Sequence, residues 1–163
     1  MKIELNLHEN SLDFLEESLE QYTIANEDGV HHSYRSDYKK KLKWKFAFIN
    51  LVQATELLLK EIISEISPIL LKPNIDNPTN DEKTITFAQS LHRFKAFSTI
   101  SLSDEDIAHL IKCAKLRNQF THFNVSISSE EAKKNIVHSL YYIEECMKNF
   151  LKTNYISKTL ILP

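Results

Sequence analysis

The segment from Leu116 to His122, with the sequence LRNQFTH, places an arginine and a histidine five positions apart. Arg117 carries a permanent positive charge and a fork of N–H donors that suits a phosphate group. His122 carries an imidazole, which takes up or releases a proton near neutral pH. Together they supply a charge for the phosphate and a carrier for the proton, so they could cleave a phosphodiester without a metal ion.

A purely structural role accounts for the same two residues. Arg117 can pair with a carboxylate or cap backbone carbonyl groups, and His122 suits the C-terminal end of a helix, where the dipole favours positive charge. Positions five apart on an α-helix also diverge by about 140°. Either the helix ends between the two residues, or their side chains reach a shared space from different directions.

The composition favours a single helical domain over residues 1–163. Hydrophobic residues make up 42% of the chain and charged residues 26%, which are ordinary values for a globular protein. One Gly and four Pro are too few for a sheet protein with many tight turns. Because the formal net charge is −2, no overall field attracts nucleic acid, and any such binding must use a local patch.

The two cysteines, Cys113 and Cys146, fall at apolar positions of expected helices, which favours buried reduced thiols over a disulfide. We find no cluster of cysteine and histidine at zinc spacing and expect no metal site. Residues 1–20 contain no apolar signal-peptide core, and no run approaches membrane-spanning length. These features predict a cytoplasmic protein without a membrane partner.

Apolar residues at helical spacing predict an all-α fold, an up-and-down bundle of four to five helices. The expected helices cover about 10–27, 34–66, 86–97, a stretch that starts at 103 and delivers Arg117, and 129 to about 154. Asn10 or Ser11 is expected to cap the first helix, and Ser103 and Ser128 to cap the last two. Alternating apolar residues also indicate short β segments at the two ends, Met1–Leu7 and Thr159–Leu162.

A helical bundle whose penultimate long helix ends in Leu-Arg-Asn-x-x-x-His resembles the HEPN family. Members carry an Arg, four to six residues and then a His, usually with a polar residue directly after the Arg, which here is Asn118. The segment Ala54–Lys60 is similar to the Ala-x-Glu-x-x-x-Lys pattern of many members, and a proline-bearing loop follows it. The resemblance covers about residues 41–152, which would be a HEPN-like core behind an added N-terminal helix.

The resemblance implies a metal-independent endoribonuclease that works as a homodimer and needs no cofactor. A base must take the 2′-hydroxyl proton and an acid must protonate the leaving 5′-oxygen. One chain offers a single His122 and a single Arg117, whereas a two-fold dimer offers two of each across one groove. The products would be a 2′,3′-cyclic phosphate and a 5′-hydroxyl, in a toxin–antitoxin or phage-defence setting.

Two further residues receive candidate roles from the same resemblance. Asn118 would hold the geometry or contact the phosphate, unless it is simply a surface residue. Glu56 would orient Arg117 or His122, unless it only pairs with Lys60 one turn away. A protein inhibitor, including one of the nucleotidyltransferase type, is a further expected partner. In some members that partner modifies a Tyr two residues after the His; because Asn124 stands there, we do not expect that modification.

Five lysines crowd a short run around Trp44 and could steer an RNA backbone, with Trp44 stacked on a base: Lys39, Lys40, Lys41, Lys43 and Lys45. The alternative is the solvated start of a helix with Trp44 packed inward. We assign no role to His31 and His32 or to the histidines within helices, His92, His109 and His138.

Two other functions remain open on the sequence. A catalytically inactive HEPN-like module would bind RNA, a nucleotide or a protein partner without cutting, and a structural helical dimer would do neither.

Overall fold

The computed structural model describes residues 6–26, 34–77, 83–98, 100–122 and 126–148. Within these residues the fold is all-α, which confirms the predicted helical bundle. The elements are α1 (Leu7–Asn26), α2 (Tyr34–Ile66), the short 3-10 helix η1 (Pro68–Leu71), α3 (Phe87–Phe97), α4 (Asp104–His122) and α5 (Ser129–Cys146). None of the helices described is both long and apolar enough to cross a membrane.

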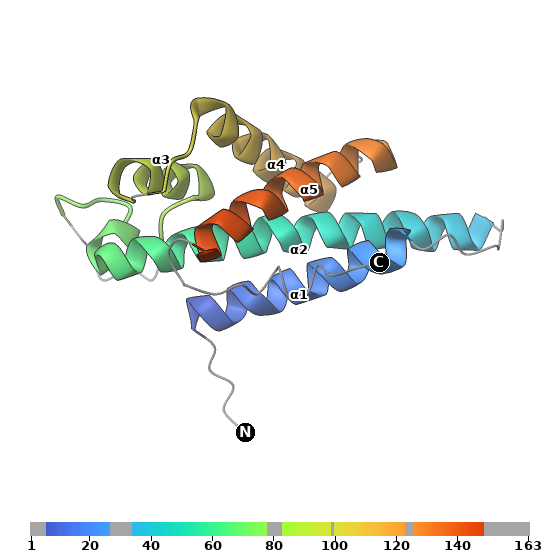
Figure 1. Ribbon diagram of the computed structural model, residues 1–163, viewed down its shortest axis with the longest axis horizontal. Coiled ribbons are helices and arrows are strands. Elements are labelled where there is room, and N and C mark those ends of the chain that lie inside the picture. Colours follow the sequence, from blue (N-terminus) through green and yellow to red (C-terminus); the bar gives the residue numbers. More distant parts are fainter. Residues whose placement is uncertain (1–5, 27–33, 78–82, 99, 123–125, 149–163) are drawn as a thin grey trace, which may run out of the picture.

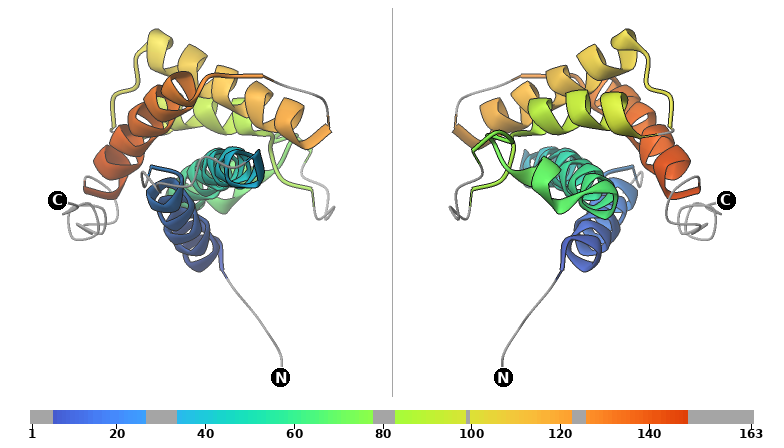
Figure 2. Two further views of the ribbon diagram at one scale, coloured as in Figure 1. Left: turned by 90° about the vertical axis from the view of Figure 1, so that its right-hand side faces the viewer. Right: turned by 90° about the vertical axis from the view of Figure 1, so that its left-hand side faces the viewer.

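The long helix α2 lies in the middle of the molecule. Its 33 residues make it about 50 Å long. Figure 1 and Figure 2 show α1 along one side of α2, while α3, α4 and α5 lie on the other side. Every other helix therefore takes its position from a different face or stretch of α2.

One hydrophobic core joins all the helices of the described residues. Burial of each large apolar side chain contributes about 1.5–3 kcal/mol. The largest side chains with almost no exposure are Phe48, Phe94, Leu15, Leu51, Ile62, Ile63, Ile85, Leu91, Ile136, Ile143 and Met147. Because α2 supplies four of these, it forms the floor on which both sides of the bundle pack.

The contact between α1 and α2 combines this core with one buried hydrogen bond. The hydroxyl of Ser18 donates to the carbonyl oxygen of Ala47 at 2.7 Å. Ala47 is fully buried, so the small side chain lets the two helices approach closely enough for that bond. The ring of Tyr22 meets Trp44 edge-on with centroids 5.5 Å apart, which extends the contact toward the start of α2.

The first helix begins earlier than its sequence pattern predicts. Asn6 accepts a hydrogen bond from the backbone N–H of Glu9 at 2.8 Å, and the Glu9 carboxylate accepts one from the backbone N–H of Asn6 at 3.0 Å. This reciprocal cap makes Leu7 the first helical residue, so the prediction of Asn10 or Ser11 as the cap is wrong. The strand predicted for Met1–Leu7 is also wrong at its last two residues; Met1–Leu5 and Thr159–Leu162 lie outside the described residues.

The other two predicted caps are confirmed. Ser103 and Asp106 exchange side-chain and backbone hydrogen bonds of 2.9 and 3.1 Å at the start of α4. Ser128 accepts from the backbone N–H of Glu131 at 3.0 Å at the start of α5. These local bonds satisfy donors that the first turn of a helix leaves unpaired.

Arg93 of α3 holds the turn that follows α2 in place. Arg93 donates to the backbone carbonyls of Leu70, of Lys72 at 2.7 Å and of Pro73 at 3.2 Å. The guanidinium thereby satisfies carbonyl groups that no helix pairs. Both cysteines are buried and reduced, as predicted.

Candidate functional site

Arg117 projects from α4 toward α2 and is largely buried there. Its Nη1 donates to Glu56 Oε2 at 2.9 Å and to Gln53 Oε1 at 3.0 Å. Its Nε and Nη2 donate to Asn118 Oδ1 at 3.3 and 3.2 Å. A guanidinium has five N–H donors, so these four contacts leave one donor on Nη2 without an acceptor among the described residues.

Glu56 is the centre of a small charged network. Its Oε1 accepts from Lys60 Nζ at 2.8 Å, while its Oε2 pairs with Arg117. Lys60 also donates to the hydroxyl of Thr84 at 3.1 Å, which ties the segment before α3 to α2. The side chains of Glu56, Lys60 and Arg117 are 13%, 10% and 18% exposed, so water screens these charges only weakly.

The network sets the protonation of its carboxylate. Burial raises the pKa of Glu56, but the hydrogen bonds and charges of Lys60 and Arg117 outweigh burial and lower it below its ordinary value of 4.5. The carboxylate is therefore ionised at neutral pH and holds Arg117 in place. Of the two roles weighed for Glu56, contact with Arg117 and pairing with Lys60, the structure contains both.

His122 lies at the last residue of α4 and is exposed. Because α4 runs unbroken from Arg117 to His122, the helix does not end between them, and the two side chains leave it about 140° apart. Within the described residues no hydrogen bond or ion pair joins His122 to Arg117. One chain alone therefore does not bring the pair together.

Asn118 is exposed beside Arg117 and contacts it through its side-chain oxygen. This contact orders the guanidinium edge that faces away from Glu56. The position fits the predicted role in holding the geometry. Its contact with phosphate stays a prediction.

The five lysines expected to bind RNA lie around the first half of α2 and not on one face. At 100° per residue, Lys39 and Lys43 share one side, Lys41 and Lys45 another, and Lys40 a third. Lys39 and Lys41 are exposed, and the other three are half-buried. Lys45 lies on nearly the same side of α2 as Glu56, about 16 Å away along the axis.

Trp44 is packed inward, in line with the alternative to base stacking. Its ring lies against Tyr22 and the hydrophobic core. The indole N–H is buried and has no acceptor in the part of the chain that the structure describes.

Two features of the site escaped sequence reasoning. Gln53 joins Glu56 in holding Arg117, and its place one turn earlier on α2 is the signal that could have indicated it. The second feature is an apolar stripe of α2 that leads to Gln53 and that the described residues leave partly exposed: Tyr38 and Phe46 are exposed, and Leu42 and Ile49 are half-buried. Tyr38 and Phe46 are 57% and 45% exposed, although helix spacing places them on one side with Gln53 and Glu56.

No family model, no curated protein and no solved structure matches this chain. Across the described residues, no group of three or more His, Cys, Asp or Glu side chains could hold a metal ion.

Proposed function

We propose that this protein is a metal-independent endoribonuclease of the HEPN type that acts as a homodimer, with Arg117 and His122 as its reacting groups. The observation that carries the proposal is the 2.9 Å ion pair between Arg117 and Glu56. The two residues lie 61 positions apart and belong to the two segments on which the HEPN resemblance rests. Their contact is what an arginine held ready for a phosphate needs, because a fixed guanidinium requires no reorganisation during reaction.

The mechanism uses two copies of the chain. One His122 takes the proton of the 2′-hydroxyl, whose oxygen attacks the phosphorus, and the other His122 protonates the leaving 5′-oxygen. Arg117 stabilises the negative charge that develops on the phosphate. It does so through the Nη2 donor that has no acceptor, and through the Nη2 donor that contacts Asn118 Oδ1 once a phosphate oxygen replaces that atom. The bond to the 5′-oxygen breaks as the bond to the 2′-oxygen forms, which leaves a cyclic phosphate and a 5′-hydroxyl.

The partly exposed stripe of Tyr38, Leu42, Phe46 and Ile49 supports the dimer. An exposed apolar stripe on a helix is a surface suited to a partner helix, and this one runs directly into Gln53 and Glu56. Two copies that pack along it would bring their Arg117 residues to the same groove. Lys41 and Lys45 flank the stripe, and the RNA backbone would lie along them.

The test is RNA cleavage in the presence of EDTA. We expect the natural chain to cut and to yield cyclic phosphate ends. His122→Ala should lower the rate about 10²–10⁴-fold because a proton carrier is lost, and Arg117→Ala about 10²–10³-fold because charge stabilisation is lost. His92→Ala is the matched control, since His92 is exposed on α3 and should leave the rate unchanged.

Subunit mixing tests the dimer separately. If both copies of His122 serve one groove, refolding the natural chain with excess His122→Ala chain lowers activity with the square of the natural fraction. If each chain acts alone, activity falls in simple proportion. Phe46→Glu should give a monomer in sedimentation and abolish cleavage, and a monomer that still cuts would contradict the proposed groove.

One observation favours a second candidate function, an inactive module that binds RNA, a nucleotide or a protein partner. Four of the five Arg117 donors are occupied by side chains of the same chain. An arginine whose donors are this fully occupied can have a structural role without contacting a phosphate. The inactive module would shift RNA in a gel without cutting it, whereas the enzyme cuts and a structural dimer does neither. The setting, toxin–antitoxin or phage defence, rests on the family resemblance alone.

A further inference from the structure

Two histidine rings meet between α4 and α5, away from the candidate site. His109 of α4 and His138 of α5 lie with ring centroids 4.1 Å apart and planes at 40°. Both are half-buried. Such a contact is compatible with neutral rings, but two positive charges at this distance would repel strongly.

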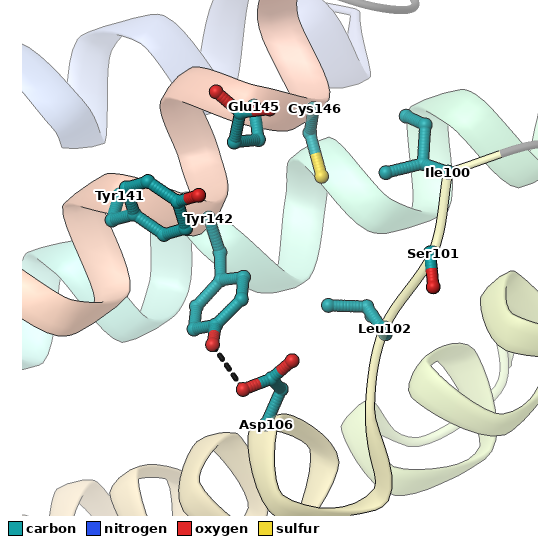
Figure 3. Close-up of a pocket in the computed structure, with 8 residues that line it drawn as sticks. All are labelled: Ile100, Ser101, Leu102, Asp106, Tyr141, Tyr142, Glu145 and Cys146. Carbon is teal, nitrogen blue, oxygen red and sulfur yellow. Dashed lines mark hydrogen bonds between the residues drawn. The ribbon is translucent and has the colours of Figure 1, made fainter.

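The hydrogen bonds of His138 fix where its proton lies. Tyr142 donates its hydroxyl hydrogen to the carboxylate of Asp106, as the dashed line in Figure 3 shows. His138 Nε2 lies 3.1 Å from that same hydroxyl oxygen. Because the phenol has a single hydrogen and gives it to Asp106, Nε2 must be the donor. Neutral His138 therefore carries its proton on Nε2.

His109 holds its proton on the opposite nitrogen. Its Nε2 lies 3.5 Å from Cys113 Sγ, and the Asn135 backbone acts on the ring so as to raise the pKa of His109. Since Nε2 faces the thiol, Nδ1 is the ring nitrogen left to donate to that backbone. The thiol then donates to Nε2, while the Ser139 hydroxyl lies 3.9 Å from Sγ as a donor. Neutral His109 is therefore protonated on Nδ1.

The groups around the two rings favour the neutral state of His109. Burial, then the neighbouring His138, then Lys112 lower the pKa of His109 from its ordinary value of 6.5. The Asn135 backbone and the Asp106 carboxylate oppose this shift but are outweighed. Because the His109 ring lies against His138 of α5, a proton on His109 disturbs the contact between the two helices.

The other titratable groups near the two rings do not supply a negative charge that would neutralise a proton on His109. Burial raises the pKa of Cys113 to about 11, so the thiol stays protonated and supplies no negative charge. Lys112 lies 3.6 Å from Glu131 of α5, which also links the two helices. Tyr142 stays a phenol because burial and then Asp106 raise its pKa.

We propose that the His109–His138 contact is a pH-sensitive joint between α4 and α5, closed while the His109 ring is neutral and weakened when that ring takes up a proton. Protonation of His109 adds an N–H that points at the Cys113 thiol hydrogen and a charge beside His138. The joint opens below neutral pH, independently of any nuclease activity, and it acts on the helix that carries Arg117 and His122.

The first test reads the rings in the natural full-length chain. With ¹⁵N-labelled histidine at pH 7.5, ring nitrogen shifts should identify the Nδ1–H form of His109 and the Nε2–H form of His138. On acidification the His109 ring should titrate below the ordinary histidine value of 6.5. A His109 that titrates at or above 6.5, or rings found in the opposite forms, would overturn the proposal.

The second test measures the thermal midpoint between pH 7.5 and 5.5. A histidine with a lowered pKa stabilises the fold above its unfolded value of 6.5, and this stability is lost as the pH falls. The natural chain should therefore lose about 2–4 °C more than His109→Gln over this range. His92→Gln is the control and should follow the natural chain. Equal losses in the natural chain and His109→Gln would contradict the joint, and the ring titration decides the question if that variant does not fold.

Discussion

Arg117 and His109 lie about 12 Å apart along α4, and the helix is joined to its neighbours by opposite means at these two points. At Arg117 the link to α2 is an ion pair that a second cation, Lys60, reinforces. At His109 the link to α5 is the contact between two tilted imidazoles, whose neighbours include the Cys113 thiol and the Tyr142 hydroxyl. One helix thus combines a contact that needs charge with a contact that needs neutrality.

The difference lies in which pH disturbs each contact. Glu56 has a lowered pKa, so its ion pair stabilises the fold above 4.5 and fails only as the pH drops below that value. The pKa of His109 is lowered from 6.5, so its contact stabilises the fold above 6.5, and this stability is lost as the pH falls from 6.5 through the lowered pKa. The α4–α5 contact should therefore yield to acid first, while the contact that holds Arg117 remains.

The largest expected effect comes from removing the shared carboxylate. Glu56→Gln leaves the charges of Arg117 and Lys60 facing each other without a counter-charge in a largely buried site. We expect a loss of about 2–3 kcal/mol in the free energy of unfolding, somewhat below the value for fully buried pairs. Urea denaturation at pH 7.5 measures it. A change below about 0.5 kcal/mol would mean that water screens this network as it does a surface pair.

A smaller loss of stability is expected from a substitution at the contact between α4 and α5. Tyr142→Phe deletes the hydroxyl that bonds Asp106 and accepts from His138. The expected loss is about 1–2 kcal/mol at pH 7.5, because a hydrogen bond to a carboxylate is removed at a half-buried site. The same urea experiment applies, with Tyr141→Phe as the neighbouring control. If the two variants lose the same stability, the hydroxyl bond to Asp106 is not what joins the helices.

The acid profile separates the two regions in one experiment. Stability of the natural chain should fall in two steps, first as the pH drops below 6.5 and again below 4.5. Glu56→Gln should keep the first step and show a smaller second step, which Asp104 and Asp106 still supply because their pKa values are also lowered. Unfolding followed by circular dichroism at fixed pH values from 7.5 to 3.5 checks this. A single step in the natural chain, or a Glu56→Gln profile that lacks both steps, would mean that the ion pair and the histidine contact do not respond to pH independently.

The smallest effect belongs to the exposed pair that also spans α4 and α5. Lys112 and Glu131 are 61% and 45% exposed and 3.6 Å apart. Glu131→Gln should change the free energy of unfolding by less than about 0.5 kcal/mol, because water screens such a pair. A larger loss in urea at pH 7.5 would assign the α4–α5 link to charge and not to the histidines.

Sequence reasoning found the elements whose signals are local. Ser103 and Ser128 could be recognised because a cap and its partner lie three residues apart. Asn6 was missed because the alternating residues before it favour a strand, and the reciprocal bond with Glu9 prevails at that point. The fold class followed from apolar periodicity, which packing then confirmed.

The site was predictable in its residue types but not in its partners. Glu56 and Arg117 were singled out, yet their 2.9 Å contact depends on how α4 crosses α2, which periodicity alone does not fix. His109 and His138 were assigned no role for the same reason. Their rings meet because α4 and α5 pack in one register, and neither residue has a partner motif in its own segment.

The central position of α2 has a consequence for insertions and deletions. Adding one residue after Asn50 would rotate the rest of this helix by about 100° and advance it by about 1.5 Å. Ala47 would still meet Ser18 on α1, but Glu56 would turn away from α4 and Lys60 away from Thr84. The continuous helix α2 thus fixes how α1 is oriented relative to α3, α4 and α5. Its length should therefore tolerate change less than the length of any loop.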